Sequence, residues 1–378
     1  MRPYDVIVVG LGAMGSATLY HLARQGKRVI GIEQFGQGHD LGSSHGDSRI
    51  IREQYFEHPL YVPLIQRAYE LWRELEEESG QSLMTLDGGL MIGPPDWMVV
   101  AGTLRSAKEY NLPHEVLSPS EVHRRFPTFE LADDLIAVLD PRAGYLTPEP
   151  CTSAHLRGAR DRGAATHFDE PMIGWKADGD GVRVTTTKGE YVADRLLLSA
   201  GAWTKELVSD LNLPLIVERQ VAFWLEPDES NVSYESREFP IFAHEFTPGI
   251  LSYGFPRMPR GVKSSIMHAG ELTESPRDVR REVDDSEIEP LRASLQPVLP
   301  GLARAPVLET SVCLFTNTPD HDFIVDFHPE HPQVLISSPC SGHGFKFASV
   351  IGEVQADLLT TGATRFDISA FRIDRFKA

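Results

Sequence analysis

The sequence predicts an α/β fold class with two domains, in which a parallel sheet alternates along the chain with an antiparallel insertion. Its length of 378 residues exceeds what a single hydrophobic core usually supports, which favours two domains. A strand, a glycine turn and a helix are indicated at the start of the chain and again over residues 333–359. Between them, over residues 221–312, strand-like runs alternate with proline and glycine loops, as in an antiparallel sheet.

The N-terminal unit has a β-α-β pattern. The apolar run from Val6 to Val9 predicts a buried strand, residues 17–23 have the apolar spacing of a helix, and residues 28–33 predict a second strand. Such a unit requires a parallel sheet with a right-handed crossover.

A G-x-G-x-x-G motif joins this first strand to its helix. The first glycine permits a tight turn, the second lets the backbone approach a pyrophosphate, and the third lets helix and strand pack closely. We expect Glu33, at the end of the second strand, to accept a hydrogen bond from a ribose hydroxyl. The complete unit predicts a dinucleotide site rather than a purely structural turn, and its glycines are Gly10, Gly12 and Gly15.

Three further helices are predicted. Residues 60–78 have apolar residues at helical spacing, and Ser118, Pro119 and Glu121 match a capping box that begins a short helix before Pro127. The same reasoning predicts a helix over residues 148–162, followed by strands within residues 181–201.

Composition and charge narrow the class of protein. The formal net charge of −18 disfavours nucleic acid and anionic membranes as partners, and no apolar stretch reaches the roughly 20 residues needed to span a bilayer. The N-terminus lacks the features of a signal peptide, so we expect a cytoplasmic protein. Neither a metal site nor a disulfide scaffold is expected, because the histidines lack ligand spacing and the three cysteines cannot all pair: Cys151, Cys313 and Cys340.

Two other segments suit FAD better than NAD, which the glycine motif alone does not distinguish. Residues 42–53 form a second loop of small polar residues with two arginines three apart, although a solvated surface loop would have the same composition. Near the C-terminus, SGHGFKFAS predicts a glycine turn into a helix whose N-terminus would stabilise the negative charge of a reduced flavin. Taken alone, Lys346 in this segment could equally lie at the surface.

Several motifs in order resemble the monomeric sarcosine oxidase family, which includes N-methyltryptophan oxidase. They are YDVIVVGLGAMGSA, SSHGDSRIIR, YGFP, the GVK segment, and SVCLFTNTPDHDFIVD followed by SGHGFKFAS, and together they extend the resemblance over essentially the whole chain. It implies a glutathione-reductase-like FAD-binding Rossmann domain of residues 1–82, 145–218 and 318–378, and an interleaved antiparallel-sheet catalytic domain of residues 83–144 and 219–317. It also implies a monomer that oxidises secondary N-methyl amino acids with oxygen and releases hydrogen peroxide.

The resemblance implies a role for particular residues. Cys313 matches the cysteine joined through sulfur to the 8α-methyl carbon of FAD, although residue type alone suggests an inert buried thiol. Lys263 matches the lysine above the flavin, whose charge helps oxygen accept an electron. Arg52 and Lys346 match the cations that hold the substrate carboxylate. Other matches are Arg49 beside the flavin ring, Tyr253 in the substrate pocket, the flavin loop residues Ser43, His45 and Ser48, and the turn residues Gly342, His343 and Gly344.

One position departs from the family pattern. A histidine is expected four residues after the lysine, but that position is Met267, and the histidine follows at His268. A local bulge could return His268 to the pocket, or the pocket wall differs and the substrate with it. His244 is a further candidate for the pocket.

The predicted function is oxidative demethylation of sarcosine to glycine and formaldehyde. In the mechanism, the substrate amine binds neutral, a hydride equivalent passes to FAD, and no protein residue acts as a strong general base. Alternative substrates are N-methyl-L-tryptophan, N-methyl-L-alanine, L-pipecolate and L-proline. Two other classes remain open at this point: an NAD-dependent dehydrogenase, which would carry no yellow chromophore, and a non-catalytic FAD-binding protein.

Overall fold

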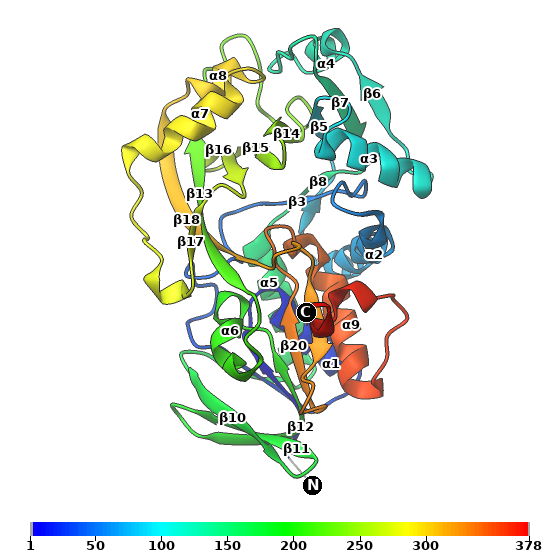
Figure 1. Ribbon diagram of the computed structural model, residues 1–378, viewed down its shortest axis with the longest axis vertical. Coiled ribbons are helices and arrows are strands. Elements are labelled where there is room, and N and C mark those ends of the chain that lie inside the picture. Colours follow the sequence, from blue (N-terminus) through cyan, green and yellow to red (C-terminus); the bar gives the residue numbers. More distant parts are fainter. Residues whose placement is uncertain (1–2, 377–378) are drawn as a thin grey trace.

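The computed structural model describes residues 3–376, and its two large sheets lie one above the other along the longest axis (Figure 1). The N-terminal strand β1 (Tyr4–Val9) pairs in parallel with β2 and with β12, so it is central and its residues Val6 to Val9 are buried. The first sheet contains β1, β2 (Val29–Ile32), β9 (Ala165–His167), β10 (Met172–Asp178), β11 (Gly181–Thr186), β12 (Glu190–Leu198), β19 (Ile324–Phe327) and β20 (Val334–Ser338).

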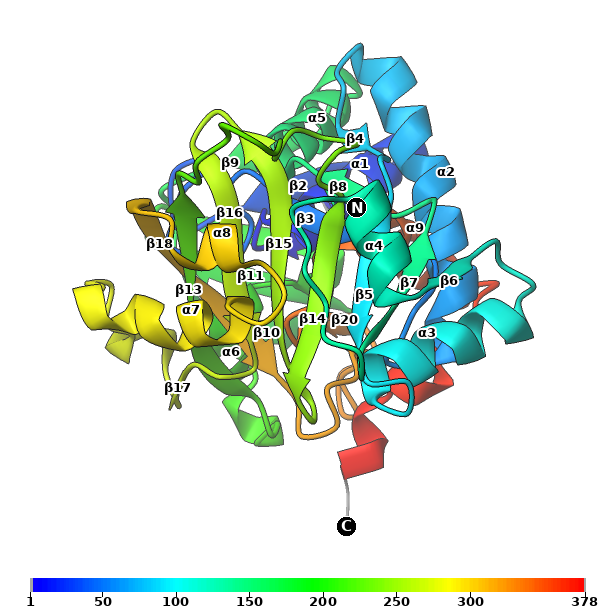
Figure 2. The ribbon, with the colours of Figure 1, turned by 90° about the horizontal axis from the view of Figure 1, so that it is seen from above.

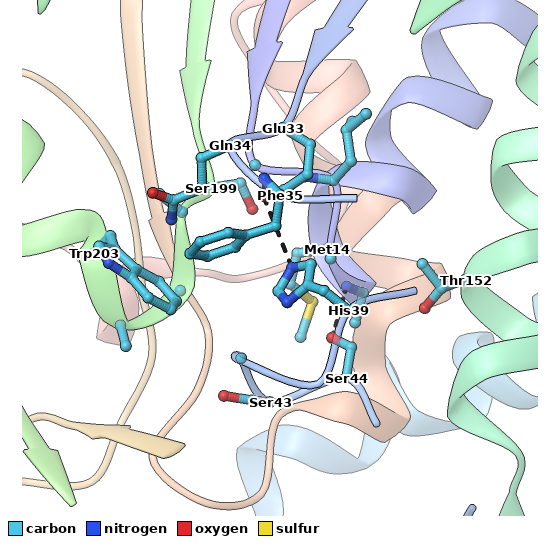
Figure 3. Close-up of a pocket in the computed structure, with 18 of the residues that line it drawn as sticks. Met14, Glu33, Gln34, Phe35, His39, Ser43, Ser44, Thr152, Ser199 and Trp203 are labelled. Atoms are coloured by element: carbon cyan, nitrogen blue, oxygen red, sulfur yellow. Dashed lines mark hydrogen bonds and ion pairs between the residues drawn. The ribbon is translucent and has the colours of Figure 1, made fainter. Parts of the chain in front are cut away.

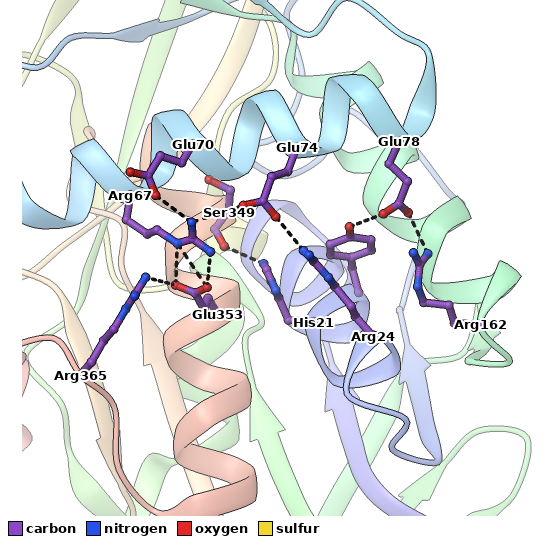
Figure 4. Close-up of polar contacts among 11 residues, drawn as sticks. His21, Arg24, Arg67, Glu70, Glu74, Glu78, Arg162, Ser349, Glu353 and Arg365 are labelled. Atoms are coloured by element: carbon purple, nitrogen blue, oxygen red, sulfur yellow. Dashed lines mark hydrogen bonds and ion pairs between the residues drawn. The ribbon is translucent and has the colours of Figure 1, made fainter.

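Helices pack on the first sheet through their apolar faces. Contacts join α1 to α2, α5 and α9, and the ion pairs between their exposed sides are drawn in Figure 4. Arg67 bonds Glu353 at 2.7 Å, and Arg24 bonds Glu74 at 2.9 Å. The helices of this part are α1 (Ala13–Arg24), α2 (Val62–Ser79), α5 (Pro148–Asp161), α6 (Thr204–Leu207) and α9 (Ala348–Thr361).

The second sheet is antiparallel except where β5 pairs with β14, and Figure 2 shows it from above with α7 and α8 lying over it. Its strands are β5 (Gly89–Gly93), β6 (Glu115–Leu117), β7 (Ile136–Asp140), β13 (Ile216–Leu225), β14 (Ile241–Thr247), β15 (Ile250–Met258), β16 (Gly261–Met267), β17 (Glu271–Thr273) and β18 (Val307–Asn317). Its helices are α3 (Met98–Glu109), α4 (Pro119–Arg125), α7 (Glu289–Leu295) and α8 (Pro300–Ala303).

A small antiparallel sheet of β3 (Arg49–Ile51), β8 (Gly144–Leu146) and β4 (Met84–Thr85) completes the fold. The predicted α/β class, with a parallel sheet at both ends of the chain and an antiparallel insertion, is confirmed. The predicted helices correspond to α1, α2, α4 and α5, and the capping box at Ser118 and Glu121 is present. The domain boundaries predicted from the sequence stay a prediction.

The C-terminal helix begins later than the glycine pattern suggested. Residues Phe345–Phe347 form a short 3₁₀ turn, and α9 starts only at Ala348. His343 and Lys346 therefore precede the α-helix. Within residues 3–376, no helix has both the length and the apolar character required to cross a membrane.

Candidate active site

A cavity of about 410 Å³ extends from the β1–α1 turn to β18, and Figure 3 shows part of its lining. The lining comes from the loop after β2, the end of β12, the strand β18 and the turn before α9. Its members include Gly10, Gly12, Glu33, Ser43, Ser44, Arg49, Ser199, Trp203, Cys313, Phe315, Gly342 and Gly344.

The glycine turn brings backbone close to this cavity. Gly10 has φ +90°, and a Cβ there would lie 2.3 Å from the carbonyl oxygen of Ser199, so no other residue fits without movement. Gly15 does not line the cavity; it packs directly against Gly10, where a Cβ would lie 1.8 Å from the Gly10 oxygen. The glycine turn thus lets the backbone at Gly10 lie close to the cavity, and it lets the start of α1 pack against that backbone at Gly15.

Glu33 is buried at the edge of the cavity and is fixed by backbone groups. Its Oε2 accepts from the Leu11 N–H at 2.8 Å, and its Oε1 accepts from the Phe35 N–H at 3.1 Å. Nε2 of His39 lies 3.7 Å from Oε1, a contact marked in Figure 3. Each carboxylate oxygen keeps a free lone pair that can accept from a ribose hydroxyl.

The loop after β2 closes the helix end of the cavity. Ser44 Oγ accepts from the Ala13 N–H at 3.1 Å, at the N-terminus of α1, and no acidic residue lies in that first turn. The amides of a helix N-terminus favour an anion. A glycine turn under a helix N-terminus, an acid at the second strand and a long cavity fit an extended dinucleotide such as FAD.

Cys313 lies where this cavity meets a second one, and it lines both. Arg49 Nη2 lies 3.4 Å from its sulfur and also donates to the carbonyl oxygens of Ser43 (2.7 Å) and His45 (2.6 Å). Burial raises the pKa of the thiol, but Arg49, His45 and Lys263 together outweigh burial and lower it to about 6. The sulfur is therefore a thiolate at neutral pH.

The other two cysteines lack such an environment. Cys340 also lines the larger cavity, but burial raises the pKa of its thiol to about 11. Cys151 is buried in α5, and burial raises its pKa as well. Cys313 is thus the reactive thiol of the three.

The second cavity, of about 90 Å³, lies between the small sheet and the face of β13–β16. Its lining combines charged groups with a mainly apolar wall. The charged and polar members are His45, Ser48, Arg49, Arg52, Glu57, Lys263, His343 and Lys346, and the wall includes Phe56, Ala222, Trp224, Ala243, Leu251, Tyr253, Phe255, Met267 and Phe315.

Arg52 and Lys346 lie together at one part of this cavity. Arg52 stacks on the ring of Phe56, 3.7 Å from its centroid, and forms a close ion pair with Glu57. Lys346 Nζ donates to the His343 carbonyl oxygen at 2.7 Å. Burial and the charge of Arg52 lower the pKa of Lys346 to about 7.

Glu57 was missed by the sequence reasoning. Burial alone would raise its pKa, but the charges of Arg52, His343 and Lys346 leave the pKa below its usual value, and its Oε1 has no hydrogen-bond partner. In the sequence it is one acid among 54 acidic residues, and no local pattern distinguishes it.

Lys263 is buried on the face of β16 that lines the cavity. Its Nζ donates to the carbonyl oxygens of Gly46 (2.6 Å) and Ser48 (2.9 Å). Burial and Arg49 lower its pKa well below the usual lysine value.

Strand alternation explains which residues face the cavity. Lys263, Ser265 and Met267 are two residues apart on β16, so their side chains share one face. In the register of the sheet, Trp224 is opposite Lys263, and Tyr253 is opposite Ser265. These facing rows form the floor of the cavity.

His268 and His244, two candidates for the pocket, line neither cavity. His268 follows the end of β16 with φ +62°; its Nδ1 lies 3.5 Å from Glu218 Oε2, and its ring is 4.4 Å from that of His321. The pocket position belongs to Met267, because side chains alternate between faces. The same alternation puts Ala243 in the cavity and turns His244 away, and burial lowers the pKa of His244 to about 4.

The remaining predicted residues lie along the junction. His45 Nε2 is 3.1 Å from the Gly42 carbonyl oxygen, and His343 is hydrogen-bonded to Tyr55 and, at 3.0 Å, to the His321 carbonyl oxygen. Burial lowers the pKa of His343 to about 3, so its ring is neutral. Among residues 3–376 there is no group of three or more side chains suited to hold a metal ion.

Known proteins resemble the chain over nearly its full length. Residues 5–358 match the FAD dependent oxidoreductase family. The monomeric sarcosine oxidase of Streptomyces avermitilis is 43% identical, covering 99% of this chain and 98% of that protein. The N-methyl-L-tryptophan oxidase of Yersinia pestis is 35% identical, covering 99% of this chain and 100% of that protein.

A solved structure has the same architecture. NikD, an unusual amino acid oxidase essential for nikkomycin biosynthesis, superposes with a TM-score of 0.83 at 25% identity, covering 99% of this chain and 98% of that one. The resemblance inferred from the motifs is confirmed, and an NAD-dependent dehydrogenase is set aside. The chain belongs to the family of FAD-dependent oxidoreductases that includes the monomeric sarcosine oxidases and the N-methyl-L-tryptophan oxidases.

Proposed function

We propose that the protein oxidises the C–N bond of a small secondary amino acid, with sarcosine as the first candidate, and passes the electrons to oxygen. The observation that supports this most is the junction of the two cavities at Cys313. On one side is a cavity suited to FAD, and on the other is a small chamber that holds Arg52, Lys346 and Lys263.

The chamber has the charges needed to bind an amino acid by its carboxylate. Arg52 offers a planar fork of donors and Lys346 a compact ammonium, so together they can bind both carboxylate oxygens. Glu57 bonds Arg52 when no substrate is bound, and a substrate carboxylate would replace it.

The amine of the substrate must be neutral to lose a hydride equivalent. Arg49, Arg52 and Lys346 line the chamber, and a further positive charge among them is unfavourable. The three positive charges should therefore lower the pKa of the substrate amine from its usual value of about 10. The apolar wall opposite, with Tyr253 and Met267, excludes water from the reacting bond.

FAD, when bound, would supply the electron chemistry, taking two electrons from the substrate and giving them to oxygen. Lys263 is the buried cation that would stabilise the anion formed when oxygen accepts the first electron. Loss of a hydride from the neutral amine leaves an iminium ion, which water hydrolyses. For sarcosine the products are glycine and formaldehyde.

We further propose that Cys313 carries the cofactor through a thioether to its 8α carbon. The thiolate character of Cys313 and its position at the junction support this. From the thiolate, formation of the S–C bond at the 8α-methyl carbon releases one proton and two electrons. Oxygen takes up the two electrons and, with a second proton from solvent, becomes hydrogen peroxide. The linkage prevents loss of the cofactor.

The size of the chamber and the higher identity to monomeric sarcosine oxidase favour sarcosine over N-methyl-L-tryptophan. A peroxide-coupled screen of secondary amino acids tests this choice, with N-methyl-L-alanine, L-pipecolate and L-proline included. Peroxide from N-methyl-L-tryptophan but not sarcosine would reassign the substrate, and no peroxide from any of them would overturn the oxidase function.

Acid precipitation tests the linkage. Yellow colour that stays with the precipitated wild-type protein, but is lost with Cys313→Ser, supports attachment at Cys313; Cys340→Ser is the matched control. Colour retained by Cys313→Ser would contradict the assignment.

We also propose a monomeric, cytoplasmic enzyme, and a molar mass near 42.1 kDa from light scattering would support the monomer.

A further inference from the structure

An assembly of three side chains lies beside Lys263, whose Nζ is 5.6 Å from the centroid of the Trp224 ring. The indole Nε1 of Trp224 donates to Asp47 Oδ2 at 3.1 Å, and Arg260 Nη1 donates to the same oxygen at 3.2 Å. The Arg260 guanidinium also stacks on the Trp224 ring, 3.8 Å from its centroid. Asp47 and Arg260 have no part in the mechanism above, and Trp224 enters it only as part of the chamber wall.

Asp47 belongs to a turn that holds Lys263. Gly46 has φ +93° and Asp47 has φ +65°, and the Ser48 N–H donates back to the Gly46 carbonyl oxygen at 2.8 Å. This tight shape aims the carbonyl oxygens of Gly46 and Ser48 at the Lys263 ammonium. A Cβ at Gly46 would lie 3.7 Å from both Lys263 Nζ and the Trp224 ring, so the turn fills the space between them.

Residues from α5 and from the second sheet both hold the turn of residues 46–48 in its left-handed conformation. From α5, Glu149 Oε1 accepts from the N–H groups of Gly46 (2.6 Å) and Asp47 (3.3 Å). From the second sheet, Trp224 and Arg260 hold the Asp47 carboxylate. An aspartate tolerates φ > 0 better than most residues but still at a cost, so these contacts maintain the shape.

We propose that Asp47 is a positioning residue for Lys263, and that it acts through the turn of residues 46–48. Arg260 is 31% exposed, whereas Trp224 and Lys263 are buried, so the assembly also closes the chamber from solvent behind the ammonium. Glu309 completes the closure by bonding Arg260 Nε at 2.8 Å.

The same assembly influences the charge of Lys263. Burial and Arg49 lower the pKa of Lys263, whereas Cys313, Asp47 and Glu149 raise it. A Cys313 joined to the cofactor would carry no charge. Asp47 and Glu149 would then be the carboxylates that keep the ammonium protonated, with Arg49 and Arg260 as the nearby cations.

The test separates the reaction with oxygen from the reaction with substrate. It rests on the proposed function, in which Lys263 serves the oxygen reaction. Photoreduced holoenzyme is mixed with oxygen across a range of pH, so that the result does not depend on which amino acid is the substrate. Reduction by sarcosine is measured separately without oxygen. Asp47→Asn keeps the size and the acceptor for Trp224 but removes the charge.

In wild type, the rate constant with oxygen should fall as pH rises through the pKa of Lys263, because the charged form is lost. In Asp47→Asn this fall should occur at lower pH, since one negative charge near the ammonium is gone. The rate constant above the midpoint should then be about tenfold lower, the change for a pKa displaced by about one. Reduction by sarcosine should stay within about twofold, since the carboxylate site is unchanged.

A second readout needs no turnover. Asp47→Asn should lower the Tm by about 2 °C in wild type and by less in the Lys263→Met background, because the Arg260 ion pair is lost in both backgrounds but support of the ammonium is lost only in wild type. Trp224→Phe, which removes a donor to Asp47 without a change of charge, should move the oxygen reaction in the same direction as Asp47→Asn. Arg125→Gln, which removes a surface ion pair with Glu115, is the matched control.

Each outcome decides one question. An equal Tm loss for Asp47→Asn in both backgrounds, or an unshifted pH profile, would overturn the positioning role while leaving the proposed function intact. Wild-type and Lys263→Met enzymes that react equally slowly with oxygen would instead overturn the role of Lys263 and the proposed function.

Discussion

Lys346 is a residue whose charge state changes near neutral pH. Its pKa is lowered to about 7 by burial and by Arg52, so it is an ammonium below pH 7 and neutral above it. Carboxylate binding should therefore weaken as pH rises. We expect the inhibition constant of propionate, which stays ionised above pH 6, to rise about tenfold between pH 7 and 8.5.

Substitution of Lys346 tests whether its titration causes the pH dependence of propionate binding. Lys346→Met should bind propionate weakly at all pH values, with no inflection near 7. Lys188→Met, on the exposed surface, should keep the wild-type profile. An inflection that persists in Lys346→Met would assign the titration to another group.

Glu57 forms an ion pair with Arg52, so it should compete with the substrate carboxylate for Arg52 in the proposed mode of binding. Glu57→Gln should lower the KM for the secondary amino acid about threefold, since no ion pair must be broken. It should also lower the Tm, because the buried guanidinium loses its charged partner. Steady-state kinetics measures the expected fall in KM, and thermal unfolding measures the expected fall in Tm. A higher KM would show that Glu57 assists binding instead.

At this scale, the sequence predicted residues within contiguous motifs better than residues whose role depends on packing. Glu33, Cys313 and Lys263 lie in recognisable segments, and all three line a cavity. Glu57 and Asp47 were not predicted, because their partners Arg52, Trp224 and Arg260 are fixed by tertiary contacts. Whether His268 or Met267 faces the chamber could not be decided from the sequence, because a residue's face depends on where its strand ends.

Among the elements, α4 offers a direct test of sequence-encoded structure. Ser118 Oγ accepts from the Glu121 N–H at 3.4 Å, and Glu121 Oε2 accepts from the Ser118 N–H at 2.9 Å, which completes the predicted capping box. Ser118→Ala should destabilise the protein by about 1 kcal/mol, measured as a lower Tm. Ser118→Thr keeps the hydroxyl and should recover most of the loss. Equal losses in both variants would show that the cap contributes nothing.

Helices with caps or strong periodicity were predictable, whereas the antiparallel strands were not assigned individually. Over residues 221–312 the runs are short, and their register depends on partners far away, such as β18 for β13. Register decides which side chains form the chamber floor, so the floor could not be predicted in detail. The delayed start of α9 reflects local packing of residues 345–347 that glycine spacing does not encode.

Across the whole molecule, the two sheets contribute different parts of the same site. The first sheet carries the glycine turn and Glu33, whereas Cys313 lies on β18 of the second. A cofactor that spans the large cavity would therefore link the two sheets. Cofactor binding and the stability of the whole fold should be coupled.

Cys313→Ser makes this coupling measurable, because its cofactor can dissociate. Its Tm should rise with added FAD, by about 3 °C at a hundredfold excess over the dissociation constant, because the ligand binds only the folded state. Wild type, in which the proposed linkage would retain the cofactor, should not respond to added FAD. Differential scanning calorimetry at several FAD concentrations makes the comparison, with Cys340→Ser as the control expected to behave as wild type. A Cys313→Ser protein whose Tm ignores FAD would show that the cavity does not bind the cofactor across both sheets, and would remove the structural basis for the linkage.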